Sequence, residues 1–253
     1  MKTYYINLDY RQDRNESTKK VLKKLNIEAV RFEAIKYTSE EKDGYETGGE
    51  RGCFESHLAI LKNHYNSNST EDLLILEDDI ELILRGQKNF SRVLKKLKSV
   101  DWAVCYLGGG NSTDITNLEK TISKADGSWG TTGIIYKTNY IGKIIDMLEK
   151  AVKDEKGGID AIYINKLNSV VSNKIYMATP KILFQKHALL SNINEPASGL
   201  RRKGDTKYTK CFYKIVDIIL PFSVYIKTHH VLGKIQQKLT ETIRKINHFT
   251  NQK

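Results

Sequence analysis

The sequence predicts an α/β protein in which helices flank a mainly parallel sheet. Two observations carry this prediction. Short, continuous apolar runs indicate strands that are buried on both faces, and they alternate with longer segments whose apolar residues recur every three or four positions, as on one face of a helix. A chain of 253 residues, of which 40% are hydrophobic and 28% charged, is long enough for one large domain with a substantial core.

The N-terminal elements follow from the local apolar pattern and from the polar residues between them. In chain order, we expect a strand at 3–8, a helix through 21–25, a strand at 27–32, a polar loop at 38–50 and a helix at 52–65. In the last of these segments Phe54, Leu58, Leu61 and Tyr65 share one helical face. These elements would form the first half of the sheet and its first covering helices.

The remaining elements continue the same alternation. In chain order, we expect a strand at 73–76, a helix over 90–97, a strand at 102–107 that stops at three glycines, a strand at 132–136, a helix at 139–152, a short helix near Asp160, and extended chain at 176–184 around Pro180. Strands alternating with helices favour parallel pairing, with helices on both faces of the sheet.

The character of the chain changes near residue 200, so we predict a catalytic domain at 1–199 and a basic tail at 200–253. Residues 201–253 carry 12 Lys and Arg against 3 Asp and Glu, which is +9 of the total formal charge of +11. Apolar residues at helical spacing, from Leu232 to Ile243, are interleaved with these basic residues. Such a basic amphipathic segment is typical of helices that lie on a membrane surface.

The most informative stretch is the apolar run at 73–76 that leads directly into Glu77, Asp78 and Asp79. Three adjacent carboxylates repel one another and raise each other's pKa unless a cation compensates them. Ligands of open α/β sheets bind beyond the carboxyl ends of the strands, where these acids would lie. Hard oxygen ligands suit Mg²⁺ or Mn²⁺, which often bridge to phosphates. The alternative is a solvated acidic turn after a strand.

Two further polar segments belong to the same prediction. Arg11 and Arg14 follow the first strand, where their guanidinium groups could meet a diphosphate. Ser56 and His57 are neighbours in a predicted helix, so their side chains point about 100° apart and cannot form a catalytic dyad. We expect them to hydrogen-bond within the core or to line a ligand pocket.

Taken in order, four motifs resemble one enzyme family. They are Ile-Asn-Leu-Asp at 6–9 with the two arginines, Gly-Cys-x-x-Ser-His at 52–57, Leu-Glu-Asp-Asp at 76–79, and Pro, Gln and Ser-x-Ile between 180 and 193. The chain resembles glycosyltransferase family 25, the bacterial lipooligosaccharide galactosyltransferases, over about residues 1–195. The resemblance implies a GT-A type nucleotide-sugar fold, a UDP-sugar donor, Mn²⁺ or Mg²⁺, and inverting transfer of a hexose, most simply galactose, to a glycan or lipid-linked oligosaccharide acceptor. Where the family's metal motif begins with Asp, this chain has Glu77.

The resemblance also suggests roles for particular side chains. Asp160 is the candidate general base, with capping of a short helix as its alternative role. The candidate residues for donor binding are Asn7, Arg11, Arg14, Ser56, His57, Glu77 and Asp78. Those for the metal are Asp79, Glu77 and His187. Those for the acceptor are Trp129, Thr131, Thr132 and Gln185. Of the acids, Asp79 is expected to bond the ion directly, with Glu77 reaching the donor ribose or a metal-bound water.

The composition of the chain indicates where the protein is located and helps to compare the alternative functions. Three cysteines, an odd number without metal-ligand spacing, indicate reduced thiols. Without a recognisable secretion signal, we expect a cytoplasmic protein held peripherally on the cytoplasmic face of the inner membrane by its tail. A two-metal phosphodiesterase or nuclease is one rival, but the nearly neutral body argues against a nucleic-acid partner. A non-catalytic membrane-surface adaptor is the other.

Overall fold

The computed structural model describes residues 1–38, 40–41, 43–109, 121–154 and 157–186. Within these ranges the elements are β1 (Lys2–Asn7), α1 (Gln12–Leu25), β2 (Val30–Glu33), α2 (Gly48–Asn66), β3 (Leu73–Leu76), β4 (Ile80–Leu82), α3 (Gly86–Leu97), β5 (Val104–Tyr106), β6 (Ile122–Lys124), β7 (Gly133–Tyr136), α4 (Thr138–Asp154), α5 (Ile159–Ile162), the π-helical turn η1 (Tyr163–Leu167), α6 (Asn168–Val171), β8 (Ile175–Ala178) and β9 (Leu183–Gln185).

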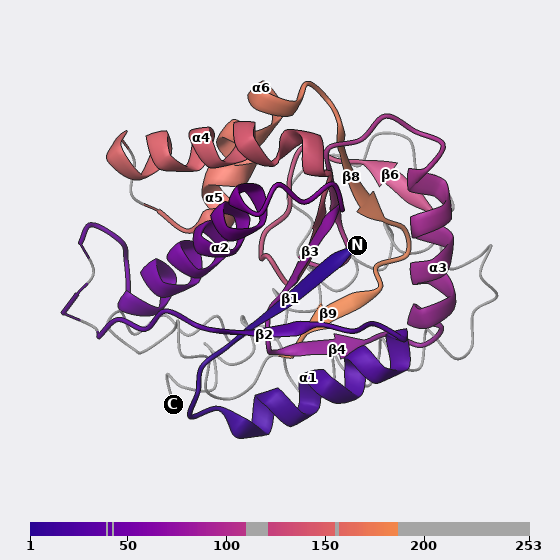
Figure 1. The fold of residues 1–253 in the computed structure, drawn as a ribbon, viewed down its shortest axis with the longest axis horizontal. Coiled ribbons are helices and arrows are strands. Elements are labelled where there is room, and N and C mark those ends of the chain that lie inside the picture. The colour runs from indigo at the N-terminus through magenta and orange to yellow at the C-terminus, as the bar shows by residue number, and fades with distance from the viewer. Residues whose placement is uncertain (39, 42, 110–120, 155–156, 187–253) are drawn as a thin grey trace, which may run out of the picture. The chain divides into compact units, whose positions relative to one another are not determined.

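A mixed seven-stranded sheet with strand order β2-β1-β3-β7-β5-β8-β6 forms the centre of the described part (Figure 1). Strand β1 pairs in parallel with β2 and β3, and β5 pairs in parallel with β8. Strand β7 is antiparallel to β3 and β5, and β6 is antiparallel to β8. Five of these strands therefore point in one direction, which confirms the predicted mainly parallel sheet. Strands β4 and β9 form a separate antiparallel pair.

Helices cover both faces of the sheet, as its buried central strand requires. All four side chains of β3 are fully buried. Leu73 and Ile75 belong to the core beneath α2 and α4, whereas Leu74 and Leu76 belong to the core beneath α1 and α3 (Figure 1). Successive side chains of a strand point to opposite faces, so a continuous apolar run is needed to fill two cores.

The direction of β7 differs from the simple alternation expected from the sequence, and it matters for the site. Strand β7 is antiparallel to both of its neighbours, β3 and β5, whereas the alternation of strands and helices predicts parallel pairing. Gly133, the first residue of β7, pairs with Leu76, the last residue of β3. The residues just before β7 therefore lie at the same sheet edge as the acids that follow β3.

Helix α2 begins earlier than the predicted residue 52. Thr47 caps it, and its side chain accepts a hydrogen bond from the Glu50 backbone N–H. Gly52 thus lies within the first turns of the helix rather than at its first residue. A Cβ at this position would lie 2.3 Å from the Ile35 carbonyl oxygen, so only glycine allows α2 to approach the chain that follows β2 this closely.

Some expectations lie outside the described residues. These are the tail at 200–253 with its boundary, Cys211, His187 and the Ser-x-Ile motif at 191–193. Among the helices of the described ranges, none has the length and apolar character needed to cross a membrane.

Candidate active site

Polar side chains converge where β1 and β3 end and β7 begins. Asn7 is the last residue of β1, Glu77 to Asp79 directly follow β3, and Thr131 precedes β7. The Glu77 backbone N–H donates to the Thr132 carbonyl at 3.2 Å, which ties the two segments together. The predicted acidic cluster therefore lies at the carboxyl edge of the sheet, as ligand sites of open α/β sheets do.

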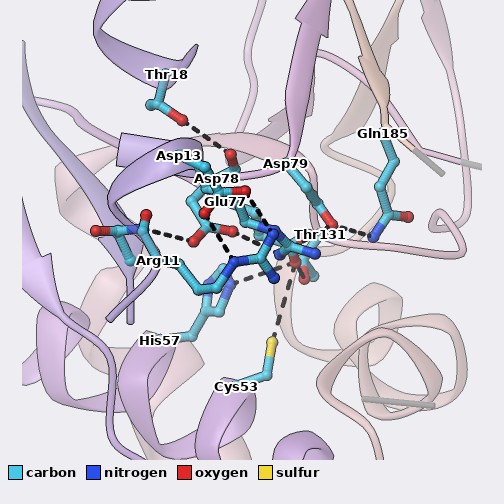
Figure 2. Close-up of polar contacts among 12 residues, drawn as sticks. Arg11, Asp13, Thr18, Cys53, His57, Glu77, Asp78, Asp79, Thr131 and Gln185 are labelled. Atoms are coloured by element: carbon cyan, nitrogen blue, oxygen red, sulfur yellow. Dashed lines mark hydrogen bonds and ion pairs between the residues drawn. The ribbon is translucent and has the colours of Figure 1, made fainter. Parts of the chain in front are cut away.

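Both carboxylate oxygens and the backbone carbonyl of Asp78 have partners within the protein. Its carboxylate accepts a hydrogen bond from Asn7 Nδ2 at 2.7 Å and forms an ion pair with Arg14 Nη1 at 2.8 Å. The Thr18 hydroxyl donates to its backbone carbonyl at 2.9 Å (Figure 2). Because Asp78 is only 8% exposed, these partners compensate a charge that water hardly reaches.

Asn7 is itself oriented by a residue that the sequence did not indicate. Arg31 Nε donates to Asn7 Oδ1 at 2.9 Å, so the Asn7 amide nitrogen is left to face Asp78. Arg31 lies within β2, and nothing in its local pattern distinguishes it from a surface arginine. Only the parallel pairing of β1 with β2 brings it next to Asn7.

Asp79 has a different environment from its neighbour. Its Oδ2 accepts from Gln185 Nε2 at 3.2 Å and lies 3.6 Å from Arg14 Nη1. Its Oδ1 is buried without a hydrogen-bond partner among the described residues. Burial raises the pKa of Asp79 above its ordinary value, since the charged form loses water. This oxygen is therefore the position in the cluster where an additional cation would be stabilising.

Glu77 faces helix α2 and Thr131. The Thr131 hydroxyl donates to Glu77 Oε1, and the same oxygen lies 3.9 Å from His57 Nε2 and 4.0 Å from Cys53 Sγ (Figure 2). Burial, followed by the neighbouring charge of Asp79, raises the pKa of Glu77 to about 8. Glu77 and Asp79 thus have different partners, although both follow β3.

Ser56 and His57 do not act as a pair, as expected for neighbours in a helix. The Ser56 hydroxyl donates to the Gly52 carbonyl at 2.6 Å and accepts from the Ile35 backbone N–H at 2.9 Å. His57 is fully buried, and burial lowers its pKa to about 3, so its ring is neutral. The structure gives Ser56 a packing role, and its contact with a donor stays a prediction.

Asp160 lies at the start of α5, where its carboxylate contacts the backbone of Gly130. Its Oδ2 accepts from the Gly130 backbone N–H and its Oδ1 from that of Ala161, both at 2.9 Å. Gly130 adopts a positive φ of 80°, which glycine tolerates best. Beside it, Trp129 is 48% exposed. A fixed carboxylate next to an exposed indole is a suitable arrangement for a sugar hydroxyl and an apolar sugar face.

The remaining predicted residues are distributed as follows. Arg11 turns to Asp13, with Nε and Nη2 donating to its carboxylate at 2.9 and 2.8 Å. The Thr132 hydroxyl is buried without a partner among the described residues. Gln185 contacts Asp79 rather than open surface.

The sequence prediction missed Cys53, whose position four residues before His57 on one helix could have indicated a shared face.

Comparisons with known proteins agree with this geometry. Residues 1–126 match the model of glycosyltransferase family 25, described as an LPS biosynthesis protein family. The chain belongs to glycosyltransferase family 25. The matched segment includes Asn7, Arg14, His57 and the three acids, whereas Thr131, Asp160 and Gln185 lie beyond it.

This family 25 chain is also similar to two curated proteins and to one solved structure. Procollagen galactosyltransferases 1-B and 1-A of Xenopus laevis are 32% and 31% identical over 126 residues, 42% of this chain and 20% of each relative. The match thus spans about a fifth of these relatives. A glycosyltransferase involved in glycosylation of the major capsid of PBCV-1 has a TM-score of 0.50 at 8% identity, covering 75% of this chain and 93% of that one. This similarity concerns the fold and agrees with the predicted GT-A type.

Proposed function

We propose that this protein is an inverting glycosyltransferase that moves a hexose, by preference galactose, from a UDP-sugar to a glycan acceptor. The observation that carries the proposal is the buried Glu77-Asp78-Asp79 cluster at the carboxyl end of β3, within the segment that matches the family 25 model. The curated relatives are galactosyltransferases by name, which is the reason for preferring galactose.

A divalent cation fits the cluster at Asp79. A buried carboxylate oxygen without a donor is a suitable ligand for Mn²⁺ or Mg²⁺, which take oxygen ligands and often retain waters. Asp79 would hold the ion, and Gln185 would orient the carboxylate through its hydrogen bond to the other oxygen. When bound, such an ion neutralises the negative charge of a departing diphosphate.

The protein's own groups supply the rest of the donor site. Arg14 pairs with Asp78 and also lies 3.6 Å from Asp79, so its position is fixed at the edge where a diphosphate would bind. A guanidinium held in this way needs little reorganisation when a phosphate arrives. Asn7 fixes the other side of Asp78. Arg11 would have to leave Asp13 to join them.

The acceptor is deprotonated by a carboxylate, and we assign this role to Asp160. The acceptor oxygen forms the new bond to the anomeric carbon while the bond from that carbon to the diphosphate oxygen breaks. The hydroxyl proton passes to Asp160, and UDP leaves with the bonding electrons. Two backbone N–H groups hold the carboxylate in place, and Trp129 offers a surface for the acceptor ring.

The biological acceptor and location are further parts of the proposal. A lipid-linked oligosaccharide at the cytoplasmic face of the inner membrane would suit the basic tail, since anionic lipids attract nearby Lys and Arg side chains. The charge of +9 in residues 201–253 supports this, and the tail itself lies outside the described residues.

Thermal unfolding with added ligands tests the proposed donor. UDP together with Mn²⁺ should raise the melting temperature of the full chain by more than the sum of the shifts that UDP and Mn²⁺ produce separately. Only the ternary complex joins the diphosphate to Asp79. A transfer assay then compares donor sugars and nucleotide bases, with UDP-galactose, UDP-glucose and GDP-mannose as the donors. A chain that is stabilised by none of these nucleotides would contradict the proposal.

A further inference from the structure

One group of ligand atoms lies beside the proposed donor site and includes a carboxylate of the same acidic cluster. Cys53, His57 and Glu77 each direct one such atom into a common volume, and these atoms all lie within 4.8 Å of one another (Figure 2). Cys53 and His57 are four residues apart in α2 and therefore share a helical face. Glu77 approaches them from the loop after β3, held by the Thr131 hydroxyl.

The environment of His57 is the second observation, and it points to a ligand. Its side chain is 0% exposed, yet neither ring nitrogen has a hydrogen-bond partner among the described residues. A buried polar group without a partner costs free energy, so nearly all such groups find one in native proteins. The Nε2 atom lies 3.9 Å from Glu77 Oε1, too far for a hydrogen bond but directed at the cluster.

The three donor types select a particular class of ion. A thiolate, an imidazole and a carboxylate together suit zinc and similar divalent ions, whereas Mg²⁺ and Mn²⁺ prefer oxygen ligands alone. With zinc bonds of about 2.3 Å to sulfur and about 2.0–2.1 Å to nitrogen or oxygen, tetrahedral ligand atoms are roughly 3.3–3.6 Å apart. The two separations from Glu77 Oε1, 3.9 and 4.0 Å, need only a small closure, and all three ligand atoms lie within 4.8 Å of one another.

We propose that Cys53, His57 and Glu77 form a second cation site, specific for a zinc-type divalent ion and distinct from the donor cation at Asp79. Binding forms bonds from the ion to Sγ, to one ring nitrogen and to a carboxylate oxygen, and the thiol proton is released to solvent. Three protein ligands leave a fourth position for water. The ion would tie α2 to the loop that presents Asp78 and Asp79, so it would stabilise the geometry of the donor site.

Cobalt titration of the full chain tests this site directly. After treatment with a chelator, the wild-type protein should show a thiolate-to-cobalt charge-transfer band in the near ultraviolet that saturates at one Co²⁺ per chain in this site. Added Zn²⁺ should abolish the band by competition. Cys53→Ala should remove it. Cys105→Ala is the matched control and should retain it, because Cys105 is a fully buried thiol in the core on the opposite face of the sheet.

Further variants separate this proposal from the donor site. Asp79→Ala should keep the cobalt spectrum while losing the stabilisation by UDP and Mn²⁺, so the two proposals can fail independently. Circular dichroism checks the fold, and Cys53→Ser replaces Cys53→Ala if the alanine variant unfolds. A wild-type chain without a charge-transfer band at saturating Co²⁺, or a band that survives both Cys53 substitutions, would overturn the second site.

Discussion

Asp78 and Asp79 are adjacent residues with similar burial, 8% and 7% exposed, and opposite surroundings. Asp78 is paired with Asn7 and Arg14, so its charge contributes to the fold. Among the described residues, Oδ1 of Asp79 has no hydrogen-bond partner, so the charge of this carboxylate is compensated incompletely until a cation binds. At the scale of single residues, this difference separates an acid that is paired within the fold from one that we propose holds a cation.

Asp78→Ala and Asp79→Ala should therefore change the stability of the protein to different degrees. Asp78→Ala leaves Arg14 without its closest partner and should lower the free energy of unfolding by about 2–4 kcal/mol. Asp79→Ala should change it by less than about 1 kcal/mol, because repulsion and an unsatisfied oxygen are removed together. Only the latter should abolish Mn²⁺-dependent stabilisation by UDP in an otherwise stable protein. Urea unfolding measures both, and a larger loss for Asp79→Ala would contradict this assignment.

Asp160→Asn tests the general base. The amide keeps the shape and one acceptor oxygen but cannot take a proton, so kcat should fall by about 100-fold or more. The affinity for UDP should be unchanged. Asp146→Asn, on the exposed surface of α4, is the matched control and should retain full activity. Unchanged kcat with a raised acceptor KM would make Asp160 a binding residue.

Lys181 gives a pH dependence that one substitution can isolate. Burial lowers its pKa to about 8, and its ammonium group donates to the Gly109 carbonyl at 2.5 Å. Between pH 8 and its ordinary pKa of 10.5, the unfolded chain binds the proton that the folded chain has lost, so stability gains with rising pH. From pH 7 to pH 10, the unfolding free energy of the wild type should rise by roughly 2 kcal/mol relative to that of Lys181→Met. A constant difference would show that Lys181 is solvated.

At the scale of elements, the close approach of α2 to residues 34–36 determines which side chains reach the acids. Gly52 permits this approach, and the Ser56 hydroxyl fixes it through the Ile35 N–H. Cys53 and His57 lie on the same stretch of helix and are carried to Glu77 by the same packing. The glycine is therefore a positioning feature of the site, although it contacts no proposed ligand.

Gly52→Ala should separate α2 from the chain after β2. The added Cβ would lie 2.3 Å from a backbone oxygen, so one of the two segments must move, at a cost of about 1–3 kcal/mol. Gly157→Ala is the matched control, since a Cβ there meets nothing within 4 Å. Thermal unfolding compares the two variants. Equal melting temperatures would mean that α2 shifts without cost.

At the scale of the whole molecule, the uneven charge is the feature to test. Reversal of the four basic residues that flank the apolar positions of the tail should abolish binding of the full chain to anionic vesicles, each side chain contributing about 1 kcal/mol. These residues are Lys234, Lys238, Arg244 and Lys245. Reversal of four exposed lysines of α1 is the control for net charge and should leave binding nearly intact: Lys19, Lys20, Lys23 and Lys24. Cosedimentation at two salt concentrations measures the effect, and equal losses in both variants would refute tail-specific docking.

The sequence by itself determined most of the elements, although not β4, β6 or α6, and the location of the acidic cluster. An apolar run that fills two cores and then meets three acids is a local signal, because strand burial and chain direction place the acids at the carboxyl edge. The apolar periodicity of α2 was equally local, and only its first turn was missed.

The tertiary structure alone decided which acid is compensated and which is not. Asn7 and Asp78 are 71 positions apart, and Gln185 and Asp79 are 106 apart, so no local pattern could pair them. The reversed direction of β7 brought Thr131 to Glu77, and the packing of α2 brought Cys53 and His57 to the same carboxylate. These contacts depend on long-range packing, in which the same residue types can be satisfied or left unpaired, whereas strand and helix patterns depend on neighbours in the chain.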